Sequence, residues 1–301
     1  MKVPCFFCGV DGGGTRTTVI CRTPEGQDIG KRLFGPFNLN SIGEESFRSV
    51  LGEILAYIGN LGTCLGLCIG ASGITNENVR SMADGILAGK GIPYILLGDY
   101  EIAHTGALGG KEGIVLIAGT GSVCFGKTCD GRSAMGGGWG HLIGDRGSGY
   151  GLGRDALVAV ARVLDGYGEP TVLTDMLYGE KGLDTPERIV SYVYSNDKSA
   201  VAALSPLVDR ACRQGDPVSR RIVDDNAREL ADIVLAVAGR LGFAGTDVAL
   251  LGGLLENPTC LRDSLLQILG SRNAALNCTA ALHSAAEGAL MEAMRLTDAG
   301  R

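Results

Sequence analysis

Two glycine-rich turns in matching surroundings, residues 12–15 and 119–122, constrain this chain more than any other feature. Each turn follows an apolar run, residues 6–10 or 113–118, and each precedes a second apolar run. Short apolar runs bounded by turn residues are typical of buried strands. The sequence therefore predicts the order strand, tight turn, strand twice, and with it a duplicated α/β unit.

Glycine turns expose successive backbone N–H groups, which together can bind an anion. Asp11 precedes the first turn, whereas Ala118 precedes the second. A carboxylate beside a phosphate is repulsive unless a cation lies between them, so this pair of turns predicts Mg-ATP, with Asp11 organising Mg2+ through water. The alternative is an ordinary Asp-Gly turn that joins two strands. The residues predicted to hold the phosphates are Gly12, Gly13, Gly14, Thr15, Gly119, Thr120, Gly121 and Ser122.

The 301 residues are enough for two domains with sizeable cores. Periodicity predicts the order βββαβαβα in the first half, and the pattern restarts at Gly113. We therefore predict a boundary near Lys111, with an N-terminal domain over residues 1–111 and a C-terminal domain over residues 112–283. In the second domain the predicted helices include residues 154–164, 186–194, 200–212 and 217–241, and the predicted strand before Gly252 covers residues 248–251.

Residues 121–128 also fit the Walker A expression, which requires a loop after a strand and a helix that starts at the lysine. Here the middle of the match is Val-Cys-Phe, which is typical of a strand, and a Cys-Asp-Gly-Arg turn follows. We therefore predict a strand at this position and no P-loop.

Two further places suggest ligand chemistry. Asp99 follows a short apolar run, where open α/β folds bind ligands, and it could take a proton from an attacking hydroxyl; the alternative is a helix N-cap. Residues 136–149 contain seven glycines around Trp139, whose ring can cover a sugar face, and Asp145 can accept hydrogen bonds from hydroxyls. The alternative there is a structural loop with a core tryptophan.

Two other motifs are weaker on their own. Asn38 lies before a predicted helix and suits a plain turn as well as a ligand contact. Gly252 and Gly253 follow a buried-type strand and would let a nucleotide approach the backbone, although they also suit a strand-to-helix turn.

Composition narrows the classes of partner. The formal net charge is −6 and no basic stretch stands out, which argues against nucleic acid as the main ligand. No apolar run approaches the roughly 20 residues of a membrane span. The ten cysteines lack metal-ligand spacing, and as buried reduced thiols they suit a cytoplasmic protein.

Taken together, these motifs resemble the N-acetylglucosamine kinase branch of the BadF/BadG/BcrA/BcrD-type ATPase family, within the sugar kinase, Hsp70 and actin superfamily. The resemblance covers nearly the whole chain and implies two duplicated ribonuclease-H-like (actin-like ATPase) domains with an active-site cleft between them. It also suggests that the last helix, residues 284–301, returns to the first domain, and that the protein is a homodimer. The matching segments are residues 10–15, 35–38, 98–99, 118–122, 137–148 and 251–253.

The resemblance also implies roles for single residues. Asp99 would be the base that takes the proton of the sugar 6-hydroxyl, Asp11 would organise Mg2+, and the two glycine turns would hold the phosphates of ATP. The residues implied to contact the amino sugar are Asn38, Thr120, Trp139 and Asp145, and those implied to border the adenosine are Gly252 and Gly253. An ATPase that activates a partner enzyme and a non-catalytic sugar sensor remain open as alternatives.

Overall fold

A computed structural model describes residues 3–298, apart from the side chains of residues 39–41 and 298. The chain divides into two compact units. Unit 1 joins the residues up to Lys111 to those from Ala281 onward, and unit 2 comprises Glu112–Ala280. The last helix belongs to unit 1 as α12 (Ala285–Asp298), and residues 299–301 of the predicted helix lie outside the described residues.

Unit 1 is built on a five-stranded sheet in the order β3-β2-β1-β4-β5. The first three strands are antiparallel neighbours, whereas β4 and β5 run parallel to β1. The strands are β1 (Cys5–Gly12), β2 (Thr17–Arg22), β3 (Asp28–Phe34), β4 (Thr63–Ala71) and β5 (Tyr94–Leu97), and the helices besides α12 are α1 (Leu39–Leu61), α2 (Glu77–Leu87) and α3 (Asp99–Ala107).

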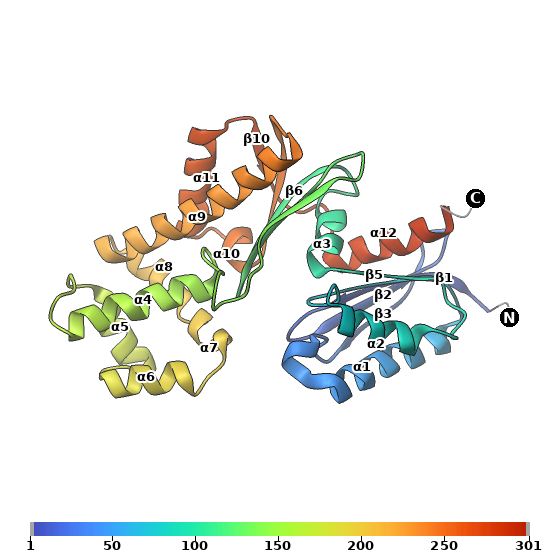
Figure 1. Ribbon diagram of the computed structural model, residues 1–301, viewed down its shortest axis with the longest axis horizontal. Helices are drawn as coiled ribbons and strands as arrows, with labels where there is room; N and C mark the ends of the chain where they lie inside the picture. The colour runs from blue at the N-terminus through green and yellow to red at the C-terminus, as the bar shows by residue number, and fades with distance from the viewer. Residues whose placement is uncertain (1–2, 299–301) are drawn as a thin grey trace. The chain divides into compact units, whose positions relative to one another are not determined.

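Helices cover both faces of this sheet because its strands are apolar on both sides (Figure 1). Alternate residues of a strand point to opposite faces. Phe6 and Val10 of β1 pack in the cluster that includes α1 and α2, whereas Phe7 packs in the cluster that includes α3 and α12. Asp11 shares the parity of Phe7, so its carboxylate lies on the face of α3 and α12.

Helix α12 approaches the rest of unit 1 so closely that small residues are required. A Cβ at Gly66 would lie 2.6 Å from the Ala293 carbonyl oxygen, and a Cβ at Gly288 would collide with the carbonyl oxygen of Ile102 in α3. Thr105 of α3 also donates a hydrogen bond of 2.5 Å to Glu292 of α12. The segment after residue 281 is therefore an integral part of unit 1.

Unit 2 repeats the sheet of unit 1, with the order β10-β9-β6-β7-β8. Its strands β6, β7 and β8 are antiparallel neighbours, and β9 and β10 run parallel to β6, which matches the pairing of β1 to β5. The strands are β6 (Gly113–Ala118), β7 (Ser122–Lys127), β8 (Ser133–Gly137), β9 (Thr246–Leu251) and β10 (Leu276–Thr279). The repeated topology confirms the predicted duplication.

The strand β7 also confirms that residues 121–128 do not form a P-loop. Eight helices belong to unit 2, and most of them lie between β8 and β9: α4 (Gly149–Leu164), α5 (Val172–Lys181), α6 (Pro186–Tyr194), α7 (Lys198–Ala202), α8 (Ser205–Arg213), α9 (Pro217–Leu241), α10 (Gly253–Glu256) and α11 (Cys260–Arg272).

The prediction of one helix over residues 200–212 is wrong, because the structure has α7 and α8 there. Leu204 is the N-cap of α8 and Pro206 occupies its first turn. Proline lacks an N–H and clashes with the preceding turn, so it begins a new helix rather than continuing one.

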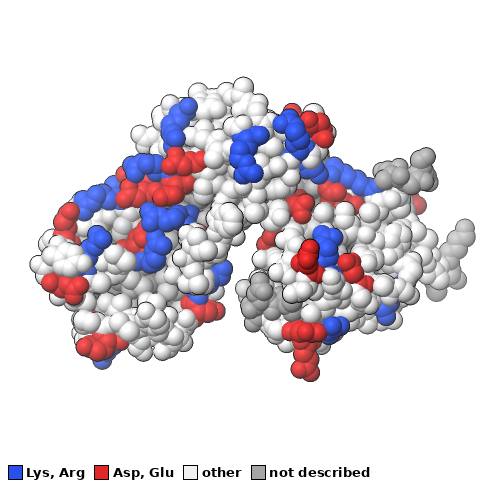
Figure 2. Space-filling model, viewed as in Figure 1, with Lys and Arg blue, Asp and Glu red and all other residues white. Residues whose placement is uncertain are grey.

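Charged side chains of both signs intermingle over the helices of unit 2 on the face shown in Figure 2. Several form ion pairs between different elements, including Arg221 of α9 with Glu169 of the α4–α5 loop at 2.7 Å, and Arg210 of α8 with Glu180 of α5. Within residues 3–298, no helix is both long and apolar enough to span a bilayer.

Candidate active site

The carboxyl ends of β1, β4 and β5 meet at one edge of the unit 1 sheet, because these three strands are parallel. Asp11 lies at the end of β1, opposite Gly70 of β4 and Thr18 of β2. Asp99 begins α3, which directly follows β5. Ligands of open α/β sheets bind at such edges, so both predicted carboxylates lie where a substrate is expected.

Asp99 is the first residue of α3, and Gly98 is its N-cap, which contradicts the alternative of Asp99 as the N-cap. The Asp99 carboxylate accepts a hydrogen bond of 3.0 Å from the Tyr100 N–H, while Glu101 accepts the Gly98 N–H at 2.7 Å. Burial raises the pKa of Asp99 and outweighs the opposing effect of the Tyr100 hydrogen bond. The result is a fixed carboxylate that is more basic than an exposed aspartate.

The pKa of Asp11 is raised to about 6, first by burial and then by repulsion from Asp99, while the charge of Arg16 acts in the opposite direction. Two carboxylates that repel each other at a sheet edge form a suitable environment for a cation. Mg2+ takes one or two carboxylates together with waters and phosphate oxygens. Asp11 fits that role, and among the described residues there is no larger cluster of His, Cys, Asp and Glu that would hold a metal.

The first glycine turn is held in place by the residues around it. A Cβ at Gly12 would lie 2.7 Å from the Phe37 ring, and the Phe37 N–H donates to the Gly13 carbonyl at 3.0 Å. Gly14 has open space in front of it. Asn38 directly follows Phe37 and precedes α1, so it lies beside this turn, and its carbonyl accepts the Ile42 N–H at 3.1 Å.

Arg16 is a residue that the sequence analysis missed. It is exposed at the end of the first turn, and its charge lowers the pKa of Asp11. The sequence feature that indicates Arg16 is its position directly after the Gly-Gly-Gly-Thr run. A positive charge there can reach the phosphate that the backbone amides of the turn are predicted to bind.

The second glycine turn is braced by the loop between β8 and α4. Asp145 accepts a hydrogen bond of 3.1 Å from the Ser122 N–H, and the Ser122 hydroxyl donates to the Arg146 carbonyl at 2.7 Å. The N–H of Gly149 donates to the Gly119 carbonyl at 2.8 Å. Ser122 therefore uses both its N–H and its hydroxyl within the protein, while Thr120 is exposed.

Asp145 differs in environment from Trp139, although both lie on this loop. Asp145 is 5% exposed and has a positive φ of 57°, and its Oδ2 atom is buried without a hydrogen-bond partner. Trp139 is 72% exposed, which contradicts the alternative of a core tryptophan. The ring of His141 packs edge-on against Tyr150, with 5.0 Å between centroids. The loop thus presents an exposed ring and a buried carboxylate oxygen that lacks a donor.

Gly252 and Gly253 lie beside the second turn because β9 runs parallel to β6. Gly252 has a φ of 87°, and a Cβ there would collide with the Ala118 carbonyl oxygen. In front of Gly253 there is open space. Unit 2 thus brings three predicted elements together at one sheet edge: the 119–122 turn, Asp145 and the Gly252-Gly253 pair.

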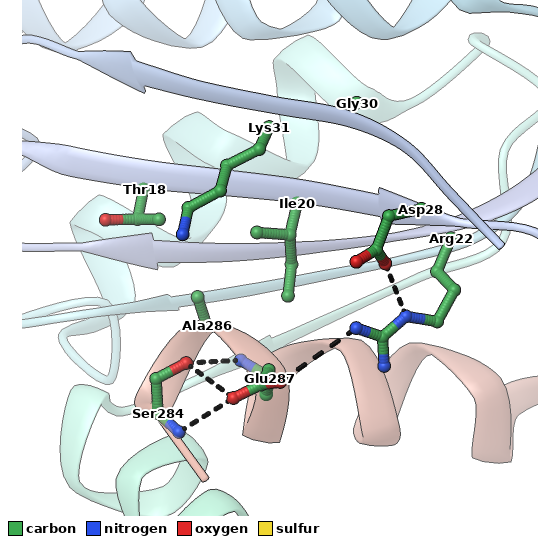
Figure 3. Close-up of a pocket in the computed structure, with 9 residues that line it drawn as sticks. All are labelled: Thr18, Ile20, Arg22, Asp28, Gly30, Lys31, Ser284, Ala286 and Glu287. Atoms are coloured by element: carbon green, nitrogen blue, oxygen red, sulfur yellow. Dashed lines mark hydrogen bonds and ion pairs between the residues drawn. The ribbon is translucent and has the colours of Figure 1, made fainter. Parts of the chain in front are cut away.

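A pocket of about 300 Å3 lies in unit 1 between the β2–β3 hairpin and the start of α12 (Figure 3). Arg22 pairs with Asp28 at 2.6 Å and with Glu287 at 3.9 Å across it. With Lys31 the lining carries two positive and two negative groups. This balance offers no surplus positive charge to a triphosphate, and none of the predicted site residues lines the pocket.

The model of the BadF/BadG/BcrA/BcrD ATPase family matches residues 8–293. The chain belongs to this family. The matched range includes both glycine turns and the three carboxylates Asp11, Asp99 and Asp145.

Two proteins that are similar to this chain are named as sugar kinases. The chain is 36% identical to an N-acetylmuramic acid/N-acetylglucosamine kinase of Clostridium acetobutylicum, over 88% of this chain and 90% of that protein. It is 32% identical to an N-acetyl-D-glucosamine kinase of Dictyostelium discoideum, over 86% and 88%. A solved structure described as a putative N-acetylglucosamine kinase of Chromobacterium violaceum has a TM-score of 0.78 at 27% identity, covering 96% and 99%.

Proposed function

We propose that this protein is an ATP-dependent kinase that transfers the γ-phosphoryl group to the 6-hydroxyl of an amino sugar of the N-acetylglucosamine or glucosamine class. One observation carries the proposal. A half-buried aspartate with a raised pKa, Asp99, lies at the edge of the unit 1 sheet where the carboxyl ends of its parallel strands meet. It does so in a chain that is 36% identical to a kinase named for N-acetylmuramic acid and N-acetylglucosamine.

Asp99 is the proposed general base. The sugar hydroxyl oxygen attacks the γ-phosphorus, the bond from that phosphorus to the β,γ-bridging oxygen breaks, and ADP leaves with the electron pair. The hydroxyl proton passes to the Asp99 carboxylate. A raised pKa suits this role because a base near the working pH still ionises yet accepts a proton readily.

The phosphates are assigned to the backbone of the two turns, residues 12–15 and 119–122, and Arg16 is added as a cation on the first turn. Gly252 and Gly253 border the adenosine in this proposal. Asp11 would hold Mg2+ through water, and the metal would neutralise negative charge on the phosphates of ATP. Because the Ser122 N–H and hydroxyl are already bonded within the protein, the contribution of Ser122 is to brace the turn.

The sugar is assigned to Asn38, Thr120, Trp139 and Asp145. The buried Oδ2 atom of Asp145 lacks a donor, and a sugar hydroxyl supplies one. Trp139 is exposed and offers a flat apolar surface to the carbon-bound hydrogens of a sugar face. Asn38 lies beside the first glycine turn and supplies an amide that both donates and accepts.

A coupled assay of ADP release over a panel of hexoses and hexosamines tests this proposal. We expect release to require an amino sugar and to yield a 6-phosphate, identified by NMR. Release that is independent of any sugar supports an ATPase that energises a partner enzyme, and sugar binding without release supports a sensor. Light scattering on the same sample checks the homodimer that we expect from the family.

A further inference from the structure

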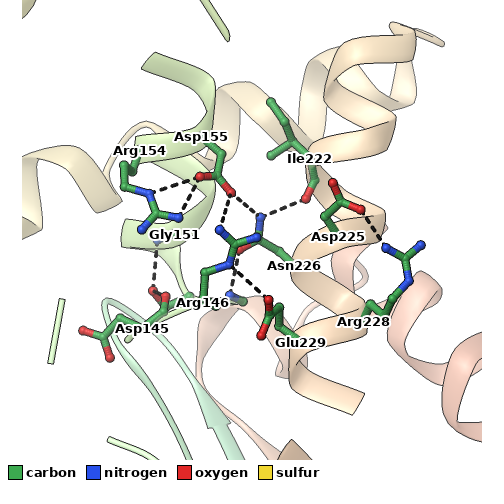
Figure 4. Close-up of polar contacts among 12 residues, drawn as sticks. Asp145, Arg146, Gly151, Arg154, Asp155, Ile222, Asp225, Asn226, Arg228 and Glu229 are labelled. Atoms are coloured by element: carbon green, nitrogen blue, oxygen red, sulfur yellow. Dashed lines mark hydrogen bonds and ion pairs between the residues drawn. The ribbon is translucent and has the colours of Figure 1, made fainter. Parts of the chain in front are cut away.

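Asn226 is a fully buried residue of helix α9, and its side chain contacts the loop that carries Asp145 (Figure 4). A buried amide is costly unless its polar atoms are bonded. The Asn226 Nδ2 atom donates to the Asp155 carboxylate at 2.8 Å and to the Ile222 carbonyl at 2.9 Å, and its Oδ1 atom accepts the Gly147 N–H at 2.8 Å. The side chain is therefore held at both ends.

The neighbours of the amide fix its orientation. If it were flipped, its oxygen would face the Asp155 carboxylate and its NH2 group would face the Gly147 N–H, so both contacts would become repulsive. Arg154 binds Asp155 at 2.8 Å and keeps that carboxylate in place. Asn226 thus joins the second turn of α4 to the loop before that helix.

The loop touches α9 so closely that little room for adjustment remains. A Cβ at Gly147 would collide with the Leu230 side chain, and a Cβ at Gly151 would lie 2.9 Å from Oδ1 of Asn226. Gly147 has a φ of 75°. The carbonyl of Asp145 accepts the Ser148 hydroxyl at 2.5 Å, which fixes the backbone on which the Asp145 carboxylate is mounted.

We infer that Asn226 is a positioning residue for the reaction. It holds the Gly147 amide, and through it the 145–149 loop, so that Asp145 keeps its hydrogen bond to Ser122 and its unpaired oxygen in place. A non-glycine residue at a φ of 57° stays there only if its surroundings hold it. Asn226 has no place in the proposed ligand contacts, and its kinetic effect rests on the proposed function.

A charge-swap series tests this inference. Asn226→Asp keeps an acceptor for the Gly147 N–H, but it places the new carboxylate next to that of Asp155, and the two repel each other. The double variant Asn226→Asp with Asp155→Asn restores a donor opposite a carboxylate. Two controls on α9 are Asp225→Asn, in an exposed ion pair with Arg228, and Val223→Ala, which truncates a buried side chain of the unit 2 core.

Amide hydrogen exchange measured by mass spectrometry gives a readout that does not depend on activity. We expect faster exchange in peptides covering residues 119–122 and 145–151 for Asn226→Asp, with recovery in the double variant. Neither control should change these peptides selectively. Exchange as slow as wild type in Asn226→Asp, or equal acceleration of the same peptides in Val223→Ala, would overturn the inference.

Kinetics give the second readout. We expect kcat/KM to fall about 10- to 100-fold in Asn226→Asp, since small misplacements of binding groups cost this much, and to return in the double variant. The Val223→Ala control should retain wild-type kcat/KM. If the wild-type protein phosphorylates no amino sugar, the proposed function fails, while the exchange experiment still decides the positioning role.

Discussion

Replacing Asp11 by asparagine should make the ligand-free protein more stable. The same change should weaken the Mg2+-dependent turnover of ATP. The pKa of Asp11 is raised from 3.8 to about 6, so the folded state holds an ionised carboxylate that it disfavours. Each pKa unit corresponds to about 1.4 kcal/mol, so ionised Asp11 costs the fold up to about 3 kcal/mol at pH 8. Asparagine has nearly the same shape and stays neutral.

The raised pKa of Asp11 also predicts how the stability of the protein changes with pH. Because the folded pKa is higher than the unfolded one, the folded protein binds more protons between pH 4 and 6, and wild-type stability falls as pH rises through that window. The gain in the free energy of unfolding of Asp11→Asn over the wild type should be greatest at pH 8 and drop to about half at pH 5. Urea unfolding followed by circular dichroism at both pH values measures it.

A double-mutant cycle with Arg16 provides the control. Arg16→Met should destabilise the wild-type background at pH 8, because its charge favours ionised Asp11, and should have much less effect in the Asp11→Asn background. An Asp11→Asn protein that is less stable than wild type at pH 8, or a difference that is equal at pH 5 and pH 8, would refute the electrostatic reasoning.

Four further outcomes are expected. Asp99→Asn should lower kcat by about 10² to 10⁴ while calorimetry still detects sugar binding, and a loss under about tenfold would exclude Asp99 as the base. The acid limb of kcat/KM should lie above the ordinary aspartate pKa of 3.8, since burial raises the pKa of Asp99; a limb at or below that value contradicts a base with a raised pKa. Trp139→Ala should raise the sugar KM, and wild-type fluorescence that ignores sugar would count against a contact. Gly252→Ala should destabilise unit 2 by at least about 2 kcal/mol in thermal melts, because Gly252 has a φ of 87° and a Cβ there would collide with the Ala118 carbonyl oxygen. Gly253→Ala is the matched control, because Gly253 has open space in front of it.

The sequence predicted strands and helices correctly where a single local pattern of residues determines the secondary structure. The paired glycine turns predicted both the duplication and the strand at residues 122–127, and the helices over residues 186–194 and 217–241 have the predicted bounds. The duplicated pattern implied strands β8 and β10, but the sequence did not locate them, because Ser133–Gly137 ends in glycines and Leu276–Thr279 is short. Elements with a regular apolar pattern were therefore predicted well, and those with an interrupted or short pattern were not.

The candidate site was only partly accessible from the sequence. Asp11 and Asp99 each followed an apolar strand, so their common sheet edge was predictable from parallel topology. The brace on Asp145 was not, because it depends on Asn226, a single polar residue within a long helix that meets the loop only after folding. Burial of Asp145 and exposure of Trp139 on the same loop likewise depend on packing and not on local composition.

The return of α12 to unit 1 has a consequence for biosynthesis. A ribosome releases all of Glu112–Ala280 before the segment that completes unit 1, so unit 2 can finish folding first. Until then, apolar side chains such as Phe7, Ile20 and Ile102 lack their covering helix. The nascent segment up to Lys111 therefore exposes these apolar side chains until α12 has been synthesised.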